Sequence, residues 1–133
     1  MINLLLVALG IVLNVSAQVA LKLAAMALVP AAADGKPGVL SLATILADPL
    51  RVVFQPWFML GLVLYAVSVV NWLVVLSRME LSVSYPLMSL ALILTLVVGV
   101  AWFKEPLTTV RVAGVLVIIL GAYLVTRPAP VAA

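Results

Sequence analysis

The chain has 133 residues, 68% of them hydrophobic and only 8% charged, with a formal net charge of +3 and neither cysteine nor histidine. A soluble domain usually carries about 25% charged residues, so this composition excludes an ordinary soluble domain and predicts an all-α membrane protein. Without cysteine or histidine, and with its basic residues scattered singly, the sequence indicates no enzyme, no metal site, no cofactor and no nucleic-acid partner.

Four apolar runs are long enough to cross a bilayer, which takes about 20 residues for each helix. They predict four transmembrane helices, here called the first to the fourth, at about 2–29, 57–77, 82–103 and 109–126 in a single domain, 1–133. Residues 30–38 are typical of a loop, and residues 39–54 predict a short interfacial helix between the first two spans. The remaining connections have only a few residues, so the last three helices are expected to run antiparallel as neighbours.

The first predicted helix contains "LNVSAQVALK" at residues 13–22, a polar stretch in an otherwise apolar run. At helical spacing Asn14, Gln18 and Lys22 lie within about 80° of one another and form one stripe. A side-chain amide in mid-membrane needs a partner, and a lysine there either reaches the interface or faces a polar cavity. We therefore interpret the stripe as a substrate-binding wall of a transport pathway.

Aromatic and hydroxyl side chains on the next two predicted helices are further substrate-binding candidates. Tyr65 and Trp72 lie on the second helix, and Tyr85 and Ser89 lie on a common side of the third. If these stripes converge, they complete the pathway. The alternative is that these residues only fill space and let the helices approach closely, as is common in membrane bundles.

Pro86 lies among these residues and allows two interpretations. It removes one backbone donor, which would free the carbonyl of Ser82 and create a hinge in the third helix. Alternatively, Pro86 sits in the first turn of that helix, where a proline is harmless.

The fourth predicted helix has almost no polar group but carries two glycines seven residues apart. Gly114, Ile118 and Gly121 share one face, and the glycines form a shallow groove in which another helix can pack. We interpret this face as a dimer interface, with packing inside the same chain as the alternative.

Several motifs together resemble the drug/metabolite transporter superfamily. They are "LNVSAQVALK" in the first helix, "SVSYPLMSLALIL" in the third, "FKEPL" after it and "GVLVIILG" in the fourth. The architecture is similar to the small multidrug resistance branch. The pattern "SVSYPLMSL" followed by "EPL" looks most like the small EamA-type proteins, which include the subunits of the undecaprenyl-phosphate-aminoarabinose flippase.

Departures from the multidrug exporters change the function that the resemblance implies. Those exporters carry a proton-exchanging glutamate in the first helix, and the matching position here is Asn14; Met88 stands where they tend to carry a tryptophan. A lysine matching Lys22 occurs in them too. The four carboxylates, at positions 34, 48, 80 and 105, all lie in predicted connections or at helix ends. We therefore expect no carboxylate-based cation exchange within the bilayer.

The sequence thus favours a membrane transporter or flippase in the bacterial inner membrane that translocates a polyprenyl-phosphate-linked sugar or a similar amphipathic lipid. Its expected partners are membrane lipid and either a second copy or a related four-helix subunit. One alternative is an exporter of small cationic or zwitterionic metabolites, held by Tyr65, Trp72 and Tyr85. Another is a non-transporting subunit of a membrane glycosyltransferase complex.

Overall fold

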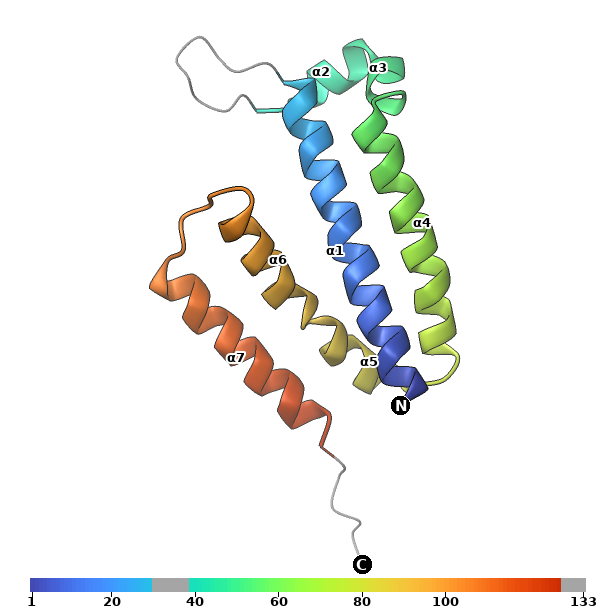
Figure 1. Ribbon diagram of the computed structural model, residues 1–133, viewed down its shortest axis with the longest axis vertical. Helices are drawn as coiled ribbons and strands as arrows, with labels where there is room; N and C mark the ends of the chain where they lie inside the picture. Colours follow the sequence, from blue (N-terminus) through green and yellow to red (C-terminus); the bar gives the residue numbers. More distant parts are fainter. Residues whose placement is uncertain (30–38, 128–133) are drawn as a thin grey trace, which may run out of the picture. The chain divides into compact units, whose positions relative to one another are not determined.

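The computed structural model describes residues 1–29 and 39–127, and in this part of the chain all regular secondary structure is helical (Figure 1). The helices are α1 (Ile2–Leu28), α2 (Leu42–Ala47), α3 (Pro49–Val53), α4 (Pro56–Leu76), α5 (Leu81–Met88), α6 (Ala91–Ala101) and α7 (Thr109–Val125). The all-α prediction is confirmed for these residues. The predicted loop at 30–38 lies outside them.

Three stretches are long and apolar enough to cross a membrane: α1, α4, and Leu81–Ala101, which combines α5 and α6. The helix α7 is also apolar but has only 17 residues. These stretches are typical of a multi-pass membrane protein. The bounds of α1, α4 and α7 differ by one residue at most from the predicted ones, because the polar and proline-bearing breaks mark them clearly.

The prediction of one continuous third helix is wrong, because a turn at Ser89 and Leu90 divides this stretch into α5 and α6. Around this turn the N–H groups of residues 89, 90, 92 and 93 donate to carbonyl groups three residues back. Hydrogen bonds with this spacing are those of the 3₁₀-helix, which is tighter than the α-helix. The apolar run therefore continues through the turn while the regular α-helical geometry does not.

Pro86 explains why the break occurs at this place. It lies inside α5, beyond the first turn, so the harmless first-turn interpretation is wrong. Having no N–H group, it cannot donate to the carbonyl of Ser82. In addition the Ser89 hydroxyl donates to the Pro86 carbonyl, and side-chain bonds of this kind bend helices. The hinge itself stays a prediction.

The predicted interfacial helix is also divided, into α2 and α3. The Ser41 hydroxyl caps α2 by accepting from the N–H of Thr44, and the Asp48 carboxylate caps α3 by accepting from the N–H of Arg51, each at 3.1 Å. Asp48 itself is not helical, with φ −144° and ψ 74°, because the following Pro49 disfavours helical geometry there. The single predicted helix was wrong because this proline begins a new helix rather than ending the segment.

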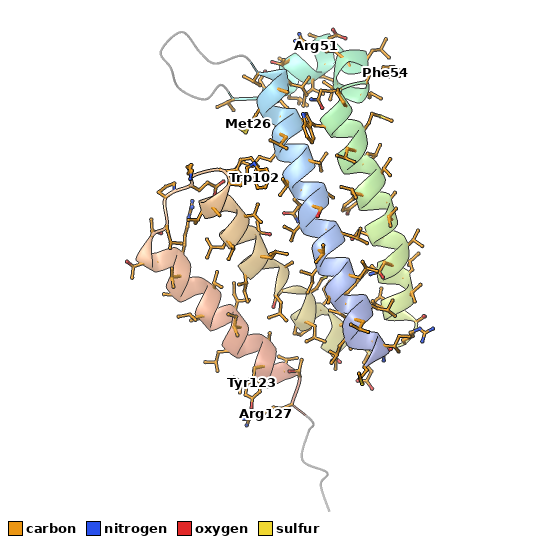
Figure 2. The ribbon with its side chains drawn as sticks, viewed as in Figure 1. Met26, Arg51, Phe54, Trp102, Tyr123 and Arg127 are labelled. Carbon is orange, nitrogen blue, oxygen red and sulfur yellow. The ribbon has the colours of Figure 1, made fainter. Side chains whose placement is uncertain are left out.

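The chain divides into two compact units, one made of Met1–Val12 with Val70–Ala133 and the other of Leu13–Val69. Helices α1 and α4 each contribute one part to each unit, and the single-domain interpretation stays a prediction. In the second unit, α2 and α3 lie between α1 and α4 in the chain. Arg51 and Phe54 belong to this connecting segment (Figure 2).

Within the second unit, α4 approaches α1 closely at Gly61. A Cβ atom at this position would lie 2.9 Å from both Cγ and Cδ2 of Leu21 and 3.2 Å from the carbonyl oxygen of Ala17. Gly61 and Ala17 are both buried. Small residues at such a crossing let two membrane helices pack backbone to backbone, which is the main source of their attraction in lipid.

Within the first unit, a hydrogen bond from a side-chain amide joins α4 to α1. Nδ2 of the buried Asn71 donates a hydrogen bond of 3.0 Å to the carbonyl oxygen of Leu6. A Cβ atom at Gly10 would lie 2.8 Å from the same nitrogen, so the glycine leaves the space that the amide uses. In the same unit, the Arg127 guanidinium contacts the ring and hydroxyl of Tyr123 at the end of α7 (Figure 2).

Candidate functional site

Asn14 and Gln18 of the predicted stripe contact each other directly. They lie one turn apart on α1, and Nε2 of Gln18 donates to Oδ1 of Asn14 at 2.7 Å. Asn14 is half-buried and Gln18 is exposed, while Lys22, one turn further, is half-buried. Each amide thus satisfies part of the hydrogen-bonding need of the other inside an apolar helix, and the side-chain carbonyl oxygen of Gln18 takes no part in this bond.

The aromatic candidates are arranged differently. The rings of Trp72 and Tyr85 are 5.6 Å apart at 85°, an edge-to-face contact. Such a pair is worth about 0.5–1.5 kcal/mol beyond its burial, so these rings help to pack α5 onto the end of α4. Tyr65 is exposed, and the Ser89 hydroxyl bonds within its own turn. The substrate role of these four residues stays a prediction.

The seven candidates therefore fall into two groups. Asn14, Gln18, Lys22 and Tyr65 belong to one unit, and Trp72, Tyr85 and Ser89 belong to the other. Direct contacts join Asn14 to Gln18 and Trp72 to Tyr85. The convergence of all seven on one pathway stays a prediction.

Sequence reasoning missed Asn71, whose amide is buried and bonded to α1. The available signal was a single amide in the apolar run of α4, and the same rule that selected Asn14 would have selected it. Asn71 has no second amide one turn away on its own helix, whereas Asn14 has Gln18. Its partner, the Leu6 carbonyl, lies 65 positions away in the chain.

A second missed feature is the return of Glu105 toward α6. Lys104 has a positive φ of 56°, which reverses the chain, and the Glu105 N–H then donates to the Gly99 carbonyl at 3.0 Å. The Glu105 carboxylate also lies beside Gly99, because its Oε2 is 3.0 Å from the position that a Cβ atom at residue 99 would take. Glu105 belongs to a connection, as expected, but its charge is directed back along α6.

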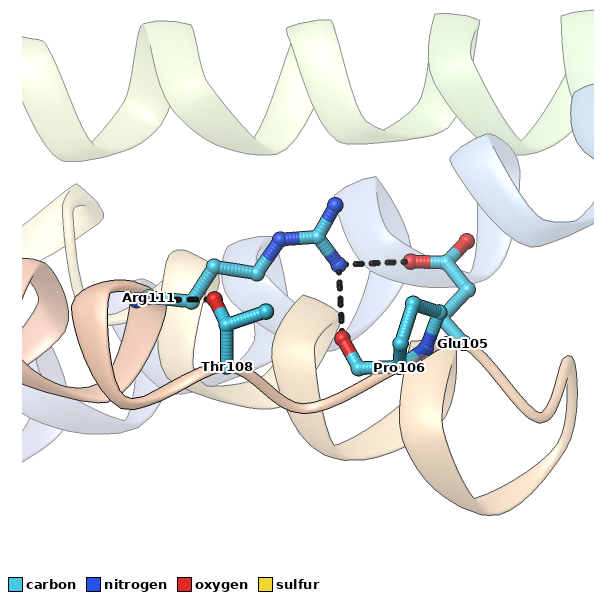
Figure 3. Close-up of polar contacts among 4 residues, drawn as sticks. All are labelled: Glu105, Pro106, Thr108 and Arg111. Carbon is cyan, nitrogen blue, oxygen red and sulfur yellow. Dashed lines mark hydrogen bonds and ion pairs between the residues drawn. The ribbon is translucent and has the colours of Figure 1, made fainter.

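The guanidinium of Arg111 meets this carboxylate (Figure 3). Its Nη1 lies 3.8 Å from Oε2 of Glu105 and donates to the carbonyl oxygen of Pro106 at 3.2 Å. Arg111 is in the first turn of α7, where its own N–H donates to the capping hydroxyl of Thr108. The side chains of the pair are 50% and 38% exposed. Exposed pairs of this kind contribute only about 0–1 kcal/mol to stability.

The predicted dimer face on α7 is open within this chain. A Cβ atom at Gly114 or Gly121 would meet no described atom within 4 Å, and α7 buries none of its described residues. Ile118 is exposed between the two glycines. The glycines are therefore not needed for close packing among the described residues of the chain.

No protein-family model matches the chain, and no solved structure matches it. Curated proteins do. It is 38% identical over 72 residues to the probable 4-amino-4-deoxy-L-arabinose-phosphoundecaprenol flippase subunit ArnF of Photorhabdus laumondii, covering 53% of this chain and 57% of the relative. With the ArnF of Aeromonas hydrophila the identity is 40% over 88 residues, or 65% and 58% of the two chains.

The companion subunit is matched as well. The chain is 32% identical over 73 residues to the probable ArnE subunit of Pseudomonas savastanoi, covering 55% of this chain and 64% of the relative. The matched stretch thus spans between about half and two thirds of the length of these relatives. The resemblance inferred from the motifs is confirmed, since the proteins it points to are similar in sequence and are named as flippase subunits.

Proposed function

We propose that this protein is a subunit of a flippase in the bacterial inner membrane that translocates a polyprenyl-phosphate-linked amino sugar. The observation that carries the proposal is the similarity to both ArnF and ArnE proteins, whose names specify 4-amino-4-deoxy-L-arabinose-phosphoundecaprenol. Four transmembrane spans, the fourth formed by the shorter α7, would bring both ends of the chain to one side of the membrane.

The amide pair on α1 supports this substrate class. A sugar presents hydroxyl groups that donate and accept hydrogen bonds, and an amide can do both without carrying a charge. Asn14 and Gln18 would take up the sugar as it crosses, with Lys22 near the phosphate. Tyr65, Trp72, Tyr85 and Ser89 would complete the pathway. No proton exchange is required of Asn14, because an amide does not titrate.

Replacing Asn14 or Gln18 by leucine should slow translocation while leaving the fold intact. We expect at least about a tenfold loss of rate for each, equivalent to about 1.4 kcal/mol of lost transition-state interaction. The measurement is the translocation of 4-amino-4-deoxy-L-arabinose-phosphoundecaprenol in proteoliposomes. Ser16→Leu is the matched control, because Ser16 is exposed on the other side of α1. The proposal fails if the unaltered protein moves the lipid no faster than empty vesicles.

A dimer through α7 would provide a second wall for the pathway, since one chain of this size encloses little space. The open face of Gly114, Ile118 and Gly121 supports this arrangement, with either a second copy or a related four-helix subunit as partner. Alternating access would then come from two subunits rocking against each other.

Gly121→Leu should weaken self-association at least about tenfold, because its side chain would fill the groove that the partner helix occupies. Cross-linking and sedimentation in detergent measure the effect. Ala113→Leu adds similar bulk about 100° away from Gly114 around the helix and should leave association unchanged. An unchanged oligomer in Gly121→Leu would exclude this face.

A further inference from the structure

A shallow cavity of about 340 Å³ lies between α6 and α7, within one of the two units. Its size is at the lower end of the range for small-molecule sites, about 300–1,000 Å³. Leu92, Leu96 and Val115 supply apolar lining, while Thr95, Glu105 and Arg111 supply polar groups. The cavity therefore combines an apolar groove with one negative and one positive charge.

Because of their positions in the chain, the two charged residues lie at one end of this groove. Glu105 and Arg111 come from the α6–α7 connection and the first turn of α7 (Figure 3), whereas Leu92, Leu96 and Val115 lie along the helices themselves. In a membrane, such a connection lies near the headgroup region and the helices lie in the hydrocarbon. The arrangement matches an amphiphile with its headgroup at the charged pair and its tail along the groove.

The chemistry of the pair selects the headgroup. An arginine binds phosphate through two parallel hydrogen bonds, and a carboxylate accepts hydrogen bonds from an ammonium group. A ligand with only a phosphate would meet repulsion from Glu105, and one with only an ammonium would meet repulsion from Arg111. A ligand with both groups satisfies both side chains. The existing pair is long at 3.8 Å and its side chains are 50% and 38% exposed, so a ligand can reach both charges.

We propose that the Glu105–Arg111 groove between α6 and α7 binds a zwitterionic, amine- and phosphate-bearing lipid headgroup, namely that of the lipid-linked substrate. This assignment rests on the proposed function and adds a headgroup site to it, apart from the amide stripe of α1. Glu105 takes the ammonium group, Arg111 takes the phosphate, and Leu92, Leu96 and Val115 contact the first part of the tail. Gly114 and Ile118 border the groove, and Gly121, two turns from Gly114, remains available to a partner subunit.

Lipid titration of the purified full chain in an uncharged detergent, read by native mass spectrometry, tests the headgroup preference. The probes are phosphatidylethanolamine, which has an amine and a phosphate, phosphatidic acid, which lacks the amine, and diacylglycerol with the same tails. We expect phosphatidylethanolamine to bind about tenfold more tightly than phosphatidic acid. Glu105→Gln should abolish this preference, and Arg111→Gln should weaken both phospholipids about tenfold.

Matched controls come from the α4–α5 connection, where Arg78 and Glu80 carry the same charges in exposed positions. Arg78→Gln and Glu80→Gln should bind all three lipids as the unaltered protein does. If Glu105→Gln does not fold, Glu105→Asp keeps the charge and should keep the preference, while Val115→Trp should fill the groove and reduce binding of every probe. The proposal would be overturned if Glu105→Gln and Arg111→Gln bound the lipid probes as tightly as the unaltered protein does.

The same variants in the translocation assay separate this proposal from the proposed function. Slower translocation of the lipid-linked sugar together with lost lipid preference supports the substrate site. Lost preference with translocation at the full rate would mean that the groove serves bulk phospholipid, which overturns the substrate assignment. If the unaltered protein keeps the headgroup preference but moves no lipid, the proposed function fails and the headgroup site stands.

Discussion

Gly61→Leu should cause a large loss of stability at the close contact between α1 and α4. The Cβ atom alone would lie 2.9 Å from two atoms of Leu21 and 3.2 Å from the Ala17 carbonyl. The Leu21 side chain can move, but the Ala17 carbonyl is backbone and moves only with α1 itself. Overpacking usually costs about 1–3 kcal/mol, and the four carbons of a leucine place this variant at or above the upper end.

Thermal unfolding in detergent, followed by circular dichroism, measures this effect. Gly61→Ala should fall between the unaltered protein and Gly61→Leu, because it adds only the clashing Cβ. Gly121→Ala is the control, since a Cβ there meets no described atom within 4 Å, and its stability should not fall, because alanine favours a helix over glycine by about 1 kcal/mol. Equal unfolding temperatures for Gly61→Leu and the unaltered protein would show that this helix contact does not stabilise the fold.

Asn71→Asp should cause a loss of stability at least as large as that of Gly61→Leu. Asn71 is only 9% exposed, and its Nδ2 donates to the Leu6 carbonyl. An ionised carboxylate would place an oxygen against that carbonyl oxygen and would carry a buried charge without a described cation in contact. Burying a charge in this way costs several kcal/mol, even after the surroundings relax.

Asn71→Leu separates the cost of the charge from the loss of the hydrogen bond. Hydrogen bonds between membrane helices average about 0.6 kcal/mol and reach about 1.7 kcal/mol, so the leucine variant should unfold at only a slightly lower temperature. The aspartate variant should yield little folded protein in size-exclusion chromatography. Similar stability of the two variants would mean that the site is open to water, contrary to its burial.

Local chemistry explains which parts of the fold were predictable. The bounds of α1, α4 and α7 follow from apolar runs bounded by polar or proline-bearing breaks, and an apolar run in lipid must satisfy its own backbone. The break between α5 and α6 was not predicted, although Pro86 was recognised. A proline changes the hydrogen bonding of the turns around it, but whether the helix bends or ends depends on other bonds, such as that from Ser89 to the Pro86 carbonyl.

The candidate site was predictable only where its members lie on one helix. Helical periodicity placed Asn14 and Gln18 on one stripe, and they do contact each other. By itself the sequence thus determined the membrane class, the bounds of α1, α4 and α7, the α1 amide pair and the resemblance to flippase subunits, because these depend on composition and local spacing. Only the tertiary structure decided the bond from Asn71 to Leu6, the pairing of Trp72 with Tyr85 and the return of Glu105 toward Gly99. These contacts depend on how separate helices approach and on one reversed backbone angle at Lys104, neither of which local spacing specifies.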